Sequence, residues 1–410
     1  MRYRLQETEN LSNALILTSA LLNHLFDLIA STSRLHLIEK PHTKMKKIAL
    51  TLLAAATTGS LLNAAPFLAI GDGAELFVTG TLGIRADDNI YTVEKATSDT
   101  IFDINPGLEI TFGKDAALKG SLTLVDSFSN YSDNSKLNTN LFTGDLRANF
   151  EEGKLKLNFN TGFHEMNQNT PTLSGLTRRD QFVIGTGAEI EISAITALGA
   201  DVKFTHDNFK VKGYADTDEL SVPLKMYYKW TEKVDLSFGY SYRSYETTIG
   251  LDSTDHFFNV GARGQFTPKL SGKFSAGVAT RKFDLRNSET LPGFDAKLTY
   301  ALTEKTSIDA GSSYDFGTSP QGVQQKNFSL NGGININLDE QWTVNGGLSL
   351  RSVDYYTRTD DYVEGILGAG YVVNTYVKIS ASYTYRNNNS PLAGGSFTQN
   401  VFSISTNFRY

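Results

Sequence analysis

The sequence predicts an all-β protein, namely a transmembrane, antiparallel, up-and-down β-barrel of about 18 strands over residues 75–410. Three observations predict this fold. Apolar and polar residues alternate with a period of two, tight turns recur about every 36 residues, and charged side chains keep to one face of the expected strands. The high aromatic content, 11% of the chain, also favours strands, because ring side chains suit a pleated surface.

The first 74 residues are expected to lie outside the barrel. Lys46 and Lys47 precede a short apolar run and small residues, which predicts a signal peptide at residues 45–64 with cleavage after Ala64. Residues 1–44 are interpreted as an upstream start that is not used, or as a disordered, cytoplasmic or membrane-anchoring extension. Residues 65–74 are expected to form a short periplasmic lead-in.

Alternation begins at Glu75 and continues to the last residue. In residues 101–112, for example, Phe102 and Ile104 share one face while Asp103 shares the other with Asn105. A single segment of this kind is weak evidence, and the strength of the signal comes from its repetition. Expected strands with this pattern include residues 75–84, 101–112, 142–150, 220–230, 234–242, 258–266, 328–338 and 402–410.

The connections alternate between tight turns and longer polar segments, which is typical of outer-membrane barrels with short periplasmic turns and long extracellular loops. About eight tight turns and nine longer segments join about 18 strands. The expected tight turns lie at residues 113–115, 151–153, 193–197, 231–233, 267–269, 303–305, 339–341 and 373–375. The expected long segments include residues 126–139, 165–180, 207–219, 246–255 and 386–396.

The charged face separates a membrane barrel from a soluble sheet. So many strands with one apolar face would leave a soluble barrel with an interior too wide for side chains to fill, so the apolar face is expected to meet lipid and the charged face water. Acidic residues such as Asp103, Glu109 and Glu189 share the charged face. The basic residues expected to line the lumen are Arg85, Lys119, Arg147, Lys156, Lys203, Lys225, Lys229, Arg243, Arg263, Lys273 and Arg409.

Two further patterns concern strand ends and prolines. Aromatics beside the tight turns, such as Trp230 and Trp342, and others near the long segments, such as Tyr355, fit the girdles found at membrane interfaces. Pro106 and Pro223 lie inside expected strands, although proline cannot donate a ladder hydrogen bond. A bulge or a later strand start is expected at Pro106.

The last ten residues, VFSISTNFRY, resemble the C-terminal signal that outer-membrane barrels present to the barrel assembly machinery. Such signals end in an aromatic residue with hydrophobic residues at alternate preceding positions. Phe402, Ile404, Phe408 and Tyr410 match this pattern, and Thr406 is the weaker position. The resemblance implies that the assembly machinery is a partner.

Residues 77–113 resemble the opening hairpin of the putative β-barrel porin family of Gram-negative bacteria. The matching residues are Asp87-Asp88-Asn89-Ile90, Asp99-Thr100-Ile101-Phe102 and Asn105-Pro106-Gly107-Leu108. The resemblance covers the whole barrel in architecture but only this hairpin and the C-terminus in motif. It implies an outer-membrane location and a barrel more than it implies a particular solute.

No pattern in the sequence indicates an enzyme, a cofactor or a metal site. The expected barrel contains His164, His206 and His256, which are interpreted as solvated residues of strand ends or loops rather than as parts of a catalytic group. The chain has no cysteine, and its net charge of -6 argues against nucleic acid as a partner.

The leading functional hypothesis is a porin-like channel for passive diffusion of small hydrophilic solutes through a water-filled lumen. The predicted inward face leans basic, which suggests a preference for anions. The alternatives are an outer-membrane barrel for surface polysaccharide export or binding, and a structural or adhesive barrel without transport. The sequence leaves solute identity, gating and oligomeric state open.

Overall fold

The computed structural model describes residues 65–71, 73–168, 176–283 and 287–410. The predicted N-terminal extension and signal peptide therefore lie outside the described residues. Besides a short 3-10 turn, Ser135–Leu137, the elements are strands. The strands are β1 (Leu68–Ile70), β2 (Ala74–Asp87), β3 (Asp99–Ile104), β4 (Gly107–Phe112), β5 (Leu118–Tyr131), β6 (Thr139–Glu152), β7 (Leu155–Gln168), β8 (Thr177–Ser193), β9 (Thr196–Phe209), β10 (Thr217–Lys229), β11 (Val234–Thr247), β12 (Ser253–Gln265), β13 (Leu270–Phe283), β14 (Glu289–Ala301), β15 (Thr306–Thr318), β16 (Gln324–Asn337), β17 (Trp342–Asp354), β18 (Thr359–Val372), β19 (Val377–Asn389) and β20 (Phe397–Arg409).

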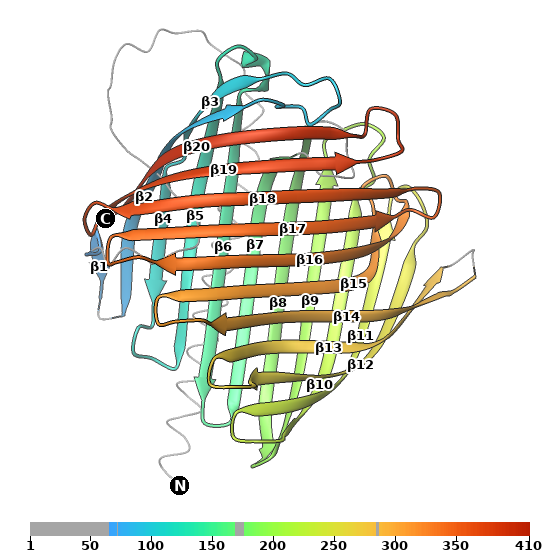
Figure 1. The fold of residues 1–410 in the computed structure, drawn as a ribbon. Helices are drawn as coiled ribbons and strands as arrows, with labels where there is room; N and C mark the ends of the chain where they lie inside the picture. The colour runs from blue at the N-terminus through green and yellow to red at the C-terminus, as the bar shows by residue number, and fades with distance from the viewer. Residues whose placement is uncertain (1–64, 72, 169–175, 284–286) are drawn as a thin grey trace. The chain divides into compact units, whose positions relative to one another are not determined.

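The strands form a closed antiparallel barrel, in which each strand pairs with the next along the chain and β20 pairs with β2 (Figure 1). The barrel has 18 strands, because β3 and β4 are two halves of one strand and the three-residue β1 only adds to the end of β2. The predicted all-β fold and strand number are confirmed. Among the described residues there is no helix long and apolar enough to cross a membrane.

The prolines interrupt the ladder where they lie, but the strands continue past them. Pro106 separates β3 from β4, yet both halves pair with β2 and with β5, so the barrel strand is continuous. At Pro223, β10 keeps its register with β11 while its pairing with β9 skips from Ser221 to Leu224. Proline lacks the N–H that a ladder requires, which accounts for both interruptions.

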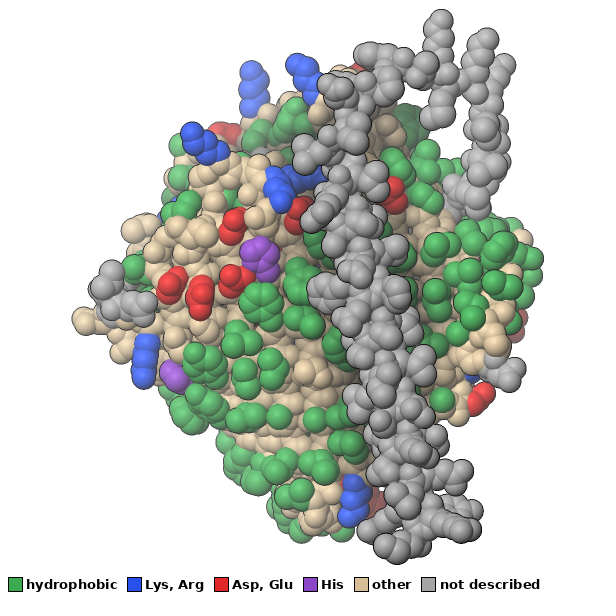
Figure 2. All heavy atoms as spheres, turned by 180° about the vertical axis from the view of Figure 1, so that it is seen from behind, with side chains coloured by type: hydrophobic (Ala, Val, Ile, Leu, Met, Phe, Trp, Pro, Cys, Tyr) green, Lys and Arg blue, Asp and Glu red, His purple; other side chains and the backbone are tan. Residues whose placement is uncertain are grey.

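The outer surface of the barrel is apolar. Leu82, Ile84, Phe258, Phe274 and Leu367 each expose between 36% and 66% of their surface, as lipid-facing side chains of a barrel do. Figure 2 shows hydrophobic side chains over much of one face, with acidic and basic side chains gathered mainly toward its upper left. Trp230 and Trp342 are exposed beside tight turns, whereas Tyr355 is only 3% exposed, so its predicted place in an aromatic girdle is wrong.

The tight turns repeat one hydrogen-bonding device at an interval of 36 residues. In four successive turns a side-chain oxygen accepts the backbone N–H two residues further on, with Thr231, Thr267, Thr303 and Asp339 in this role. Short polar side chains favour turns because they can replace backbone acceptors in this way. The repeat therefore fixes the start of each successive hairpin and the register that follows.

The long segments are shorter than the sequence predicts. Strand β5 continues to Tyr131, β7 to Gln168 and β9 to Phe209, so each extends between three and six residues into a stretch expected to be a loop. These predictions failed because strand ends that rise past the lipid into water tolerate polar side chains on both faces, so the alternation fades while the ladder continues.

Candidate functional site: the interior of the barrel

The predicted basic residues lie on the face of their strands opposite to the exposed apolar side chains. Arg85 follows Ile84, and Lys225 lies between Leu224 and Met226, which are 45% and 42% exposed. Because side chains alternate along a strand, the basic residues point away from the lipid. The interior wall is therefore the candidate functional site.

Four of the five arginines in this set, all except Arg147, form ion pairs with acidic residues of the same face. Arg85 Nε lies 2.5 Å from an oxygen of Asp103, and Arg409 Nε lies 2.9 Å from an oxygen of Glu109. The pair between Lys156 and Glu151 is longer, with 3.5 Å between the Lys156 Nζ and a carboxylate oxygen of Glu151. Paired arginines contribute little net charge to the interior. Within the described residues no ion pair involves Lys119, Arg147, Lys203, Lys225, Lys229 or Lys273.

One row of charged residues crosses β10 to β14 on the inner wall. Each member lies directly opposite the next on the neighbouring strand, and the order is Lys229, Asp235, Arg263, Lys273 and Lys297. We refer to these five residues as the lower charge row. The row holds four basic residues and one acidic residue. Its positive charge is concentrated at Arg263, Lys273 and Lys297, which follow one another without an acidic residue between them.

Arg263 is the most constrained member of the lower charge row. Its guanidinium donates to Glu189 at 2.6 and 2.8 Å and to Asp235 at 3.0 Å, and it stacks over the ring of Tyr227 at 3.4 Å. Such a planar group binds carboxylates and an aromatic face at once. Lys156 and Lys229 line the same hollow of about 330 Å³ without joining these bonds.

A second row lies nearer the outer end and alternates in charge. Arg243, Asp255, Arg281 and Glu289 face one another in turn across β11 to β14. Asp255 is 4% exposed and Arg281 is 1% exposed, so both are buried. We refer to these four residues as the upper charge row. The prediction of Asp255 in a long loop is wrong, because its strand rises past the membrane level.

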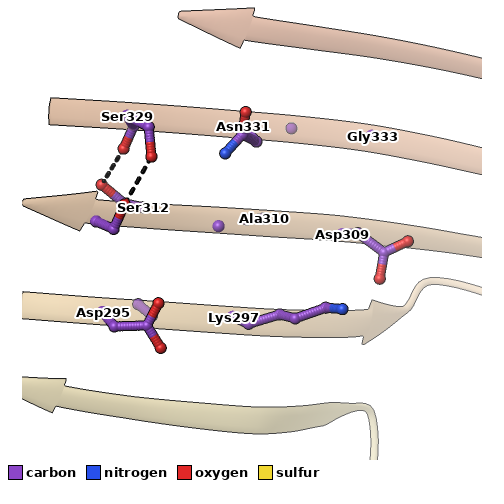
Figure 3. Close-up of a pocket in the computed structure, with 12 residues that line it drawn as sticks. Asp295, Lys297, Asp309, Ala310, Ser312, Ser329, Asn331 and Gly333 are labelled. Carbon is purple, nitrogen blue, oxygen red and sulfur yellow. Dashed lines mark hydrogen bonds between the residues drawn. The ribbon is translucent and has the colours of Figure 1, made fainter. Parts of the chain in front are cut away.

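A hollow of about 420 Å³ lies on the wall formed by β14, β15 and β16 (Figure 3). Asp295, Lys297 and Asp309 supply its charges, and hydroxyl and amide groups supply the rest, including Ser329 and Asn331. The hydroxyls of Ser313 and Ser329 lie 2.8 Å apart, within hydrogen-bond distance. The lining is small and polar, which suits contact with water and hydrogen-bonding solutes.

The histidines lie within strands, and each has a partner. His164 Nε2 lies 3.2 Å from both oxygens of Asp145, His206 Nδ1 lies 2.7 Å from Asp218, and His256 Nδ1 lies 2.9 Å from the Tyr240 hydroxyl. All three lie within four residues of a strand end, as expected, although each is paired with a neighbouring side chain. Among the residues that the structure covers, no group of three or more His, Cys, Asp or Glu is arranged to hold a metal ion.

Sequence reasoning missed Arg281 and Lys297, which belong to the two charge rows. Both keep the alternation of their strands, since Arg281 shares the face of Ala279 while Lys297 shares that of Asp295. Extending the same alternation through all of β13 and β14 would have found them.

Comparison with solved structures finds proteins that are similar over most of the chain. OccAB2 of Acinetobacter baumannii is 12% identical, with 83% of this chain and 98% of that chain covered and a TM-score of 0.46. OpdL of Pseudomonas aeruginosa is 11% identical, with 83% and 99% covered and a TM-score of 0.44. The FrpB iron transporter of Neisseria meningitidis is 8% identical, with 83% and 82% covered and a TM-score of 0.48.

No curated protein matches the sequence. A family model does match, and it spans residues 76–410, from the first residues of β2 to the C-terminus. The match covers the whole barrel, including the closing strand pair and the charged inner wall. The chain therefore belongs to the family described as "Putative beta-barrel porin 2".

Proposed function

We propose that the protein is a channel through which small hydrophilic solutes cross the outer membrane by passive diffusion. The observation that carries this proposal is the closed barrel of 18 strands with an apolar exterior and a charged interior. Strands about 4.8 Å apart and tilted by about 40° give such a barrel a backbone diameter of roughly 35 Å. Side chains alone cannot fill that width, so water is expected inside.

The lower charge row supports a preference for anions. Its surplus comes from Lys229, Lys273 and Lys297, since Arg263 is neutralised by Glu189 and Asp235. Charges on a pore wall attract counter-ions over about 10 Å at 0.1 M salt, so their effect fades as salt rises. The arginines that are paired elsewhere on the wall do not support this preference.

Recordings from purified protein in planar lipid bilayers test both parts. We expect stepwise conductance and a reversal potential in a salt gradient that indicates anion preference. Replacing both lysines, Lys273→Gln and Lys297→Gln, should lower the anion-to-cation permeability ratio by roughly two-fold. Lys282→Gln removes one lysine charge from an exposed side chain of the outer face and serves as the control for each single replacement. A protein without conductance steps would contradict the channel and favour a structural or adhesive barrel.

We also propose that the last strand is the signal read by the barrel assembly machinery. Phe402 and Ile404 expose 50% and 43% of their surface on β20, and Tyr410 exposes 42% beside its end. Replacing Phe408 and Tyr410 by alanine should reduce the amount of protein in the outer membrane. The same variant should still refold in detergent, and an unchanged cellular level would contradict the proposal.

A further inference from the structure

Strands β14 and β15 separate at their outer ends. Their pairing stops at Phe294 and Tyr314, whereas β15 and β16 stay paired as far as Thr318 and Gln324. The outer part of the β15–β16 hairpin, residues 315–325, thus leaves the wall. Pro292 lies on the edge of β14 that loses its neighbour, where a missing N–H does not weaken a ladder.

The freed hairpin lies against the inside of the wall. Phe316 is 3% exposed and packs on Ala279 and Leu291, which are 1% and 3% exposed. Ala279 follows Val278, whose side chain is 53% exposed on the lipid side, so Ala279 faces inward. The side chain of Lys326 forms an ion pair with Glu289 on the same inner surface.

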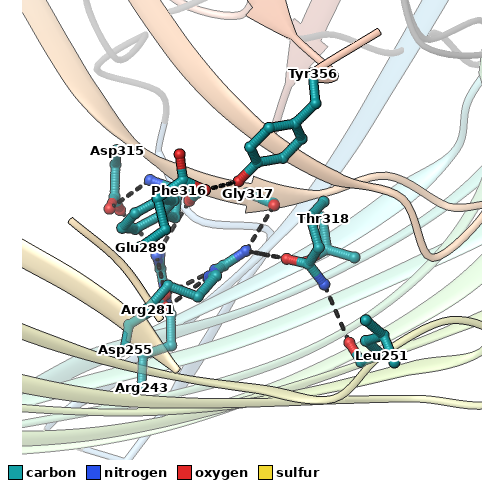
Figure 4. A network of polar contacts seen from close by, with 11 residues as sticks. Arg243, Leu251, Asp255, Arg281, Glu289, Asp315, Phe316, Gly317, Thr318 and Tyr356 are labelled. Atoms are coloured by element: carbon teal, nitrogen blue, oxygen red, sulfur yellow. Dashed lines mark hydrogen bonds and ion pairs between the residues drawn. The ribbon is translucent and has the colours of Figure 1, made fainter. Parts of the chain in front are cut away.

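Two arginines of the upper charge row hold the hairpin in place (Figure 4). Arg281 donates to both oxygens of Asp255 at 2.6 and 2.7 Å and to the carbonyl of Gly317 at 2.7 Å. It also donates to the side-chain oxygen of Gln324. Arg243 donates to Asp315 at 2.9 Å and to the carbonyl of Phe316 at 3.1 Å. Charge-assisted bonds to carbonyls in a buried site fix backbone position strongly.

The tip of the hairpin reaches the loops that precede β10 and β12. The N–H of Ala215 donates to the carbonyl of Pro320 at 2.7 Å, and Gln324 Nε2 donates to the carbonyl of Leu251 at 3.0 Å. At the closest approach, a Cβ on Gly322 would lie 1.8 Å from the carbonyl oxygen of Ile249. The hairpin therefore spans the wall from β15 back to β10.

We propose that residues 315–325 form a fixed constriction of the channel, with Arg281 and Asp255 as positioning residues. The inference rests on the proposed function, because a constriction has meaning only where solutes pass. A hairpin bonded at its base, middle and tip narrows the outer part of the lumen along the side from β10 to β15. It sets the largest solute that passes, while the lower charge row acts on charge at another level.

Bilayer recordings with neutral polymers of graded size measure this constriction, because polymers that enter the pore lower its conductance. In one variant the tip, residues 318–323, is replaced by two glycines; in another, Arg281→Gln removes the anchor. Both should raise single-channel conductance by on the order of two-fold and admit larger polymers. Lys282→Gln, one residue further along β13 and on the outer face, should change neither quantity.

An engineered disulfide can return the hairpin to its place in the Arg281→Gln variant, which distinguishes loss of the anchor from misfolding. The chain has no cysteine, so Ala215→Cys with Pro320→Cys adds the only thiols, at backbones already joined by a hydrogen bond. In the Arg281→Gln background, oxidation should restore the wild-type conductance and reduction should raise it again. In the wild-type background neither treatment should matter.

The possible failures are distinguishable. A wild-type protein without conductance contradicts the proposed function itself. Wild-type conductance that is unchanged by removal of the tip contradicts the constriction while leaving the channel intact. Should the Arg281→Gln variant fold and conduct as the wild type does, Arg281 is not a positioning residue. Should it fail to fold, the tip variant alone decides the inference.

Discussion

Asn89→Ala is the substitution for which the structure gives the sharpest expected effect on stability. Asn89 is 1% exposed and lies at the outer end of the seam between β2 and β20. Its Nδ2 donates to the carbonyls of Thr398 at 2.9 Å and Val93 at 2.8 Å, and its Oδ1 accepts the N–H of Val93 at 3.2 Å. One of these bonds joins residues 309 positions apart.

The magnitude follows from these bonds. Each buried hydrogen bond contributes about 1 kcal/mol net, and polar partners left without water cost more. Losing three bonds at a buried site should therefore lower the free energy of unfolding by about 3 kcal/mol. Asp87 bonds to Gln399 and Asp88 to Asn400 across the same seam, so these neighbours keep the seam paired in the variant.

Urea unfolding of protein refolded in lipid vesicles measures the change, with fluorescence of the two tryptophans as the signal. Trp230 and Trp342 lie beside tight turns at the opposite end of the barrel, so they report unfolding of the whole barrel rather than local change. Asn130→Ala, at an exposed position near the outer end of β5, is the control and should change stability by less than about 0.5 kcal/mol. Equal effects of the two substitutions would refute the reasoning.

Three further predictions concern a turn, the lower charge row and the hairpin. The pKa of Asp339 is lowered because its carboxylate accepts the N–H groups of Trp342 and Gln341. Its contribution to stability is present above pH of about 3.9 and is lost as pH falls through the lowered folded-state pKa, so urea midpoints of wild type and Asp339→Ala should converge in acid. Arg263→Gln should move the reversal potential toward cations, because Glu189 then stands unpaired on the inner wall. Gly322→Ala should increase open-channel noise, because φ of 73° and the close carbonyl of Ile249 leave no room for a Cβ.

The barrel wall could be predicted from the sequence because its determinants are local. A side chain's face follows from its neighbours one residue away, and turn residues such as Thr231 and Thr267 bond to N–H groups two and three positions on. Both the number of strands and the face on which the predicted basic residues lie follow from such neighbours in the sequence. Loop lengths failed because the alternation ends at the membrane surface while the ladder does not.

The upper charge row and the hairpin could not be predicted in the same way. Arg243 and Asp315 are 72 positions apart, and Arg281 and Gln324 are 43 apart, with no periodicity to connect them. Asp255 was expected in a loop, where its burial between two arginines has no signature in the sequence. Pro292 is only a partial hint: a proline inside a strand favours an edge or an interruption, but Pro223 lies in a strand that keeps both neighbours.

In the hairpin, alternation along the strand predicts the wrong environment for a side chain, namely lipid instead of the inner wall of the barrel. Phe316 and Lys326 continue the outward-facing series of β15 and β16, in which Ile308 and Phe328 are exposed. Because the hairpin turns inside the barrel, its outward face meets the wall, so Phe316 is buried and Lys326 pairs with Glu289. By the same geometry the opposite face of the hairpin, which carries the half-exposed Asp315, turns toward the passage. Asp315 therefore belongs to the residues that decide which solutes pass. The alternation along β15 alone does not distinguish it from the other charged residues of the inner wall.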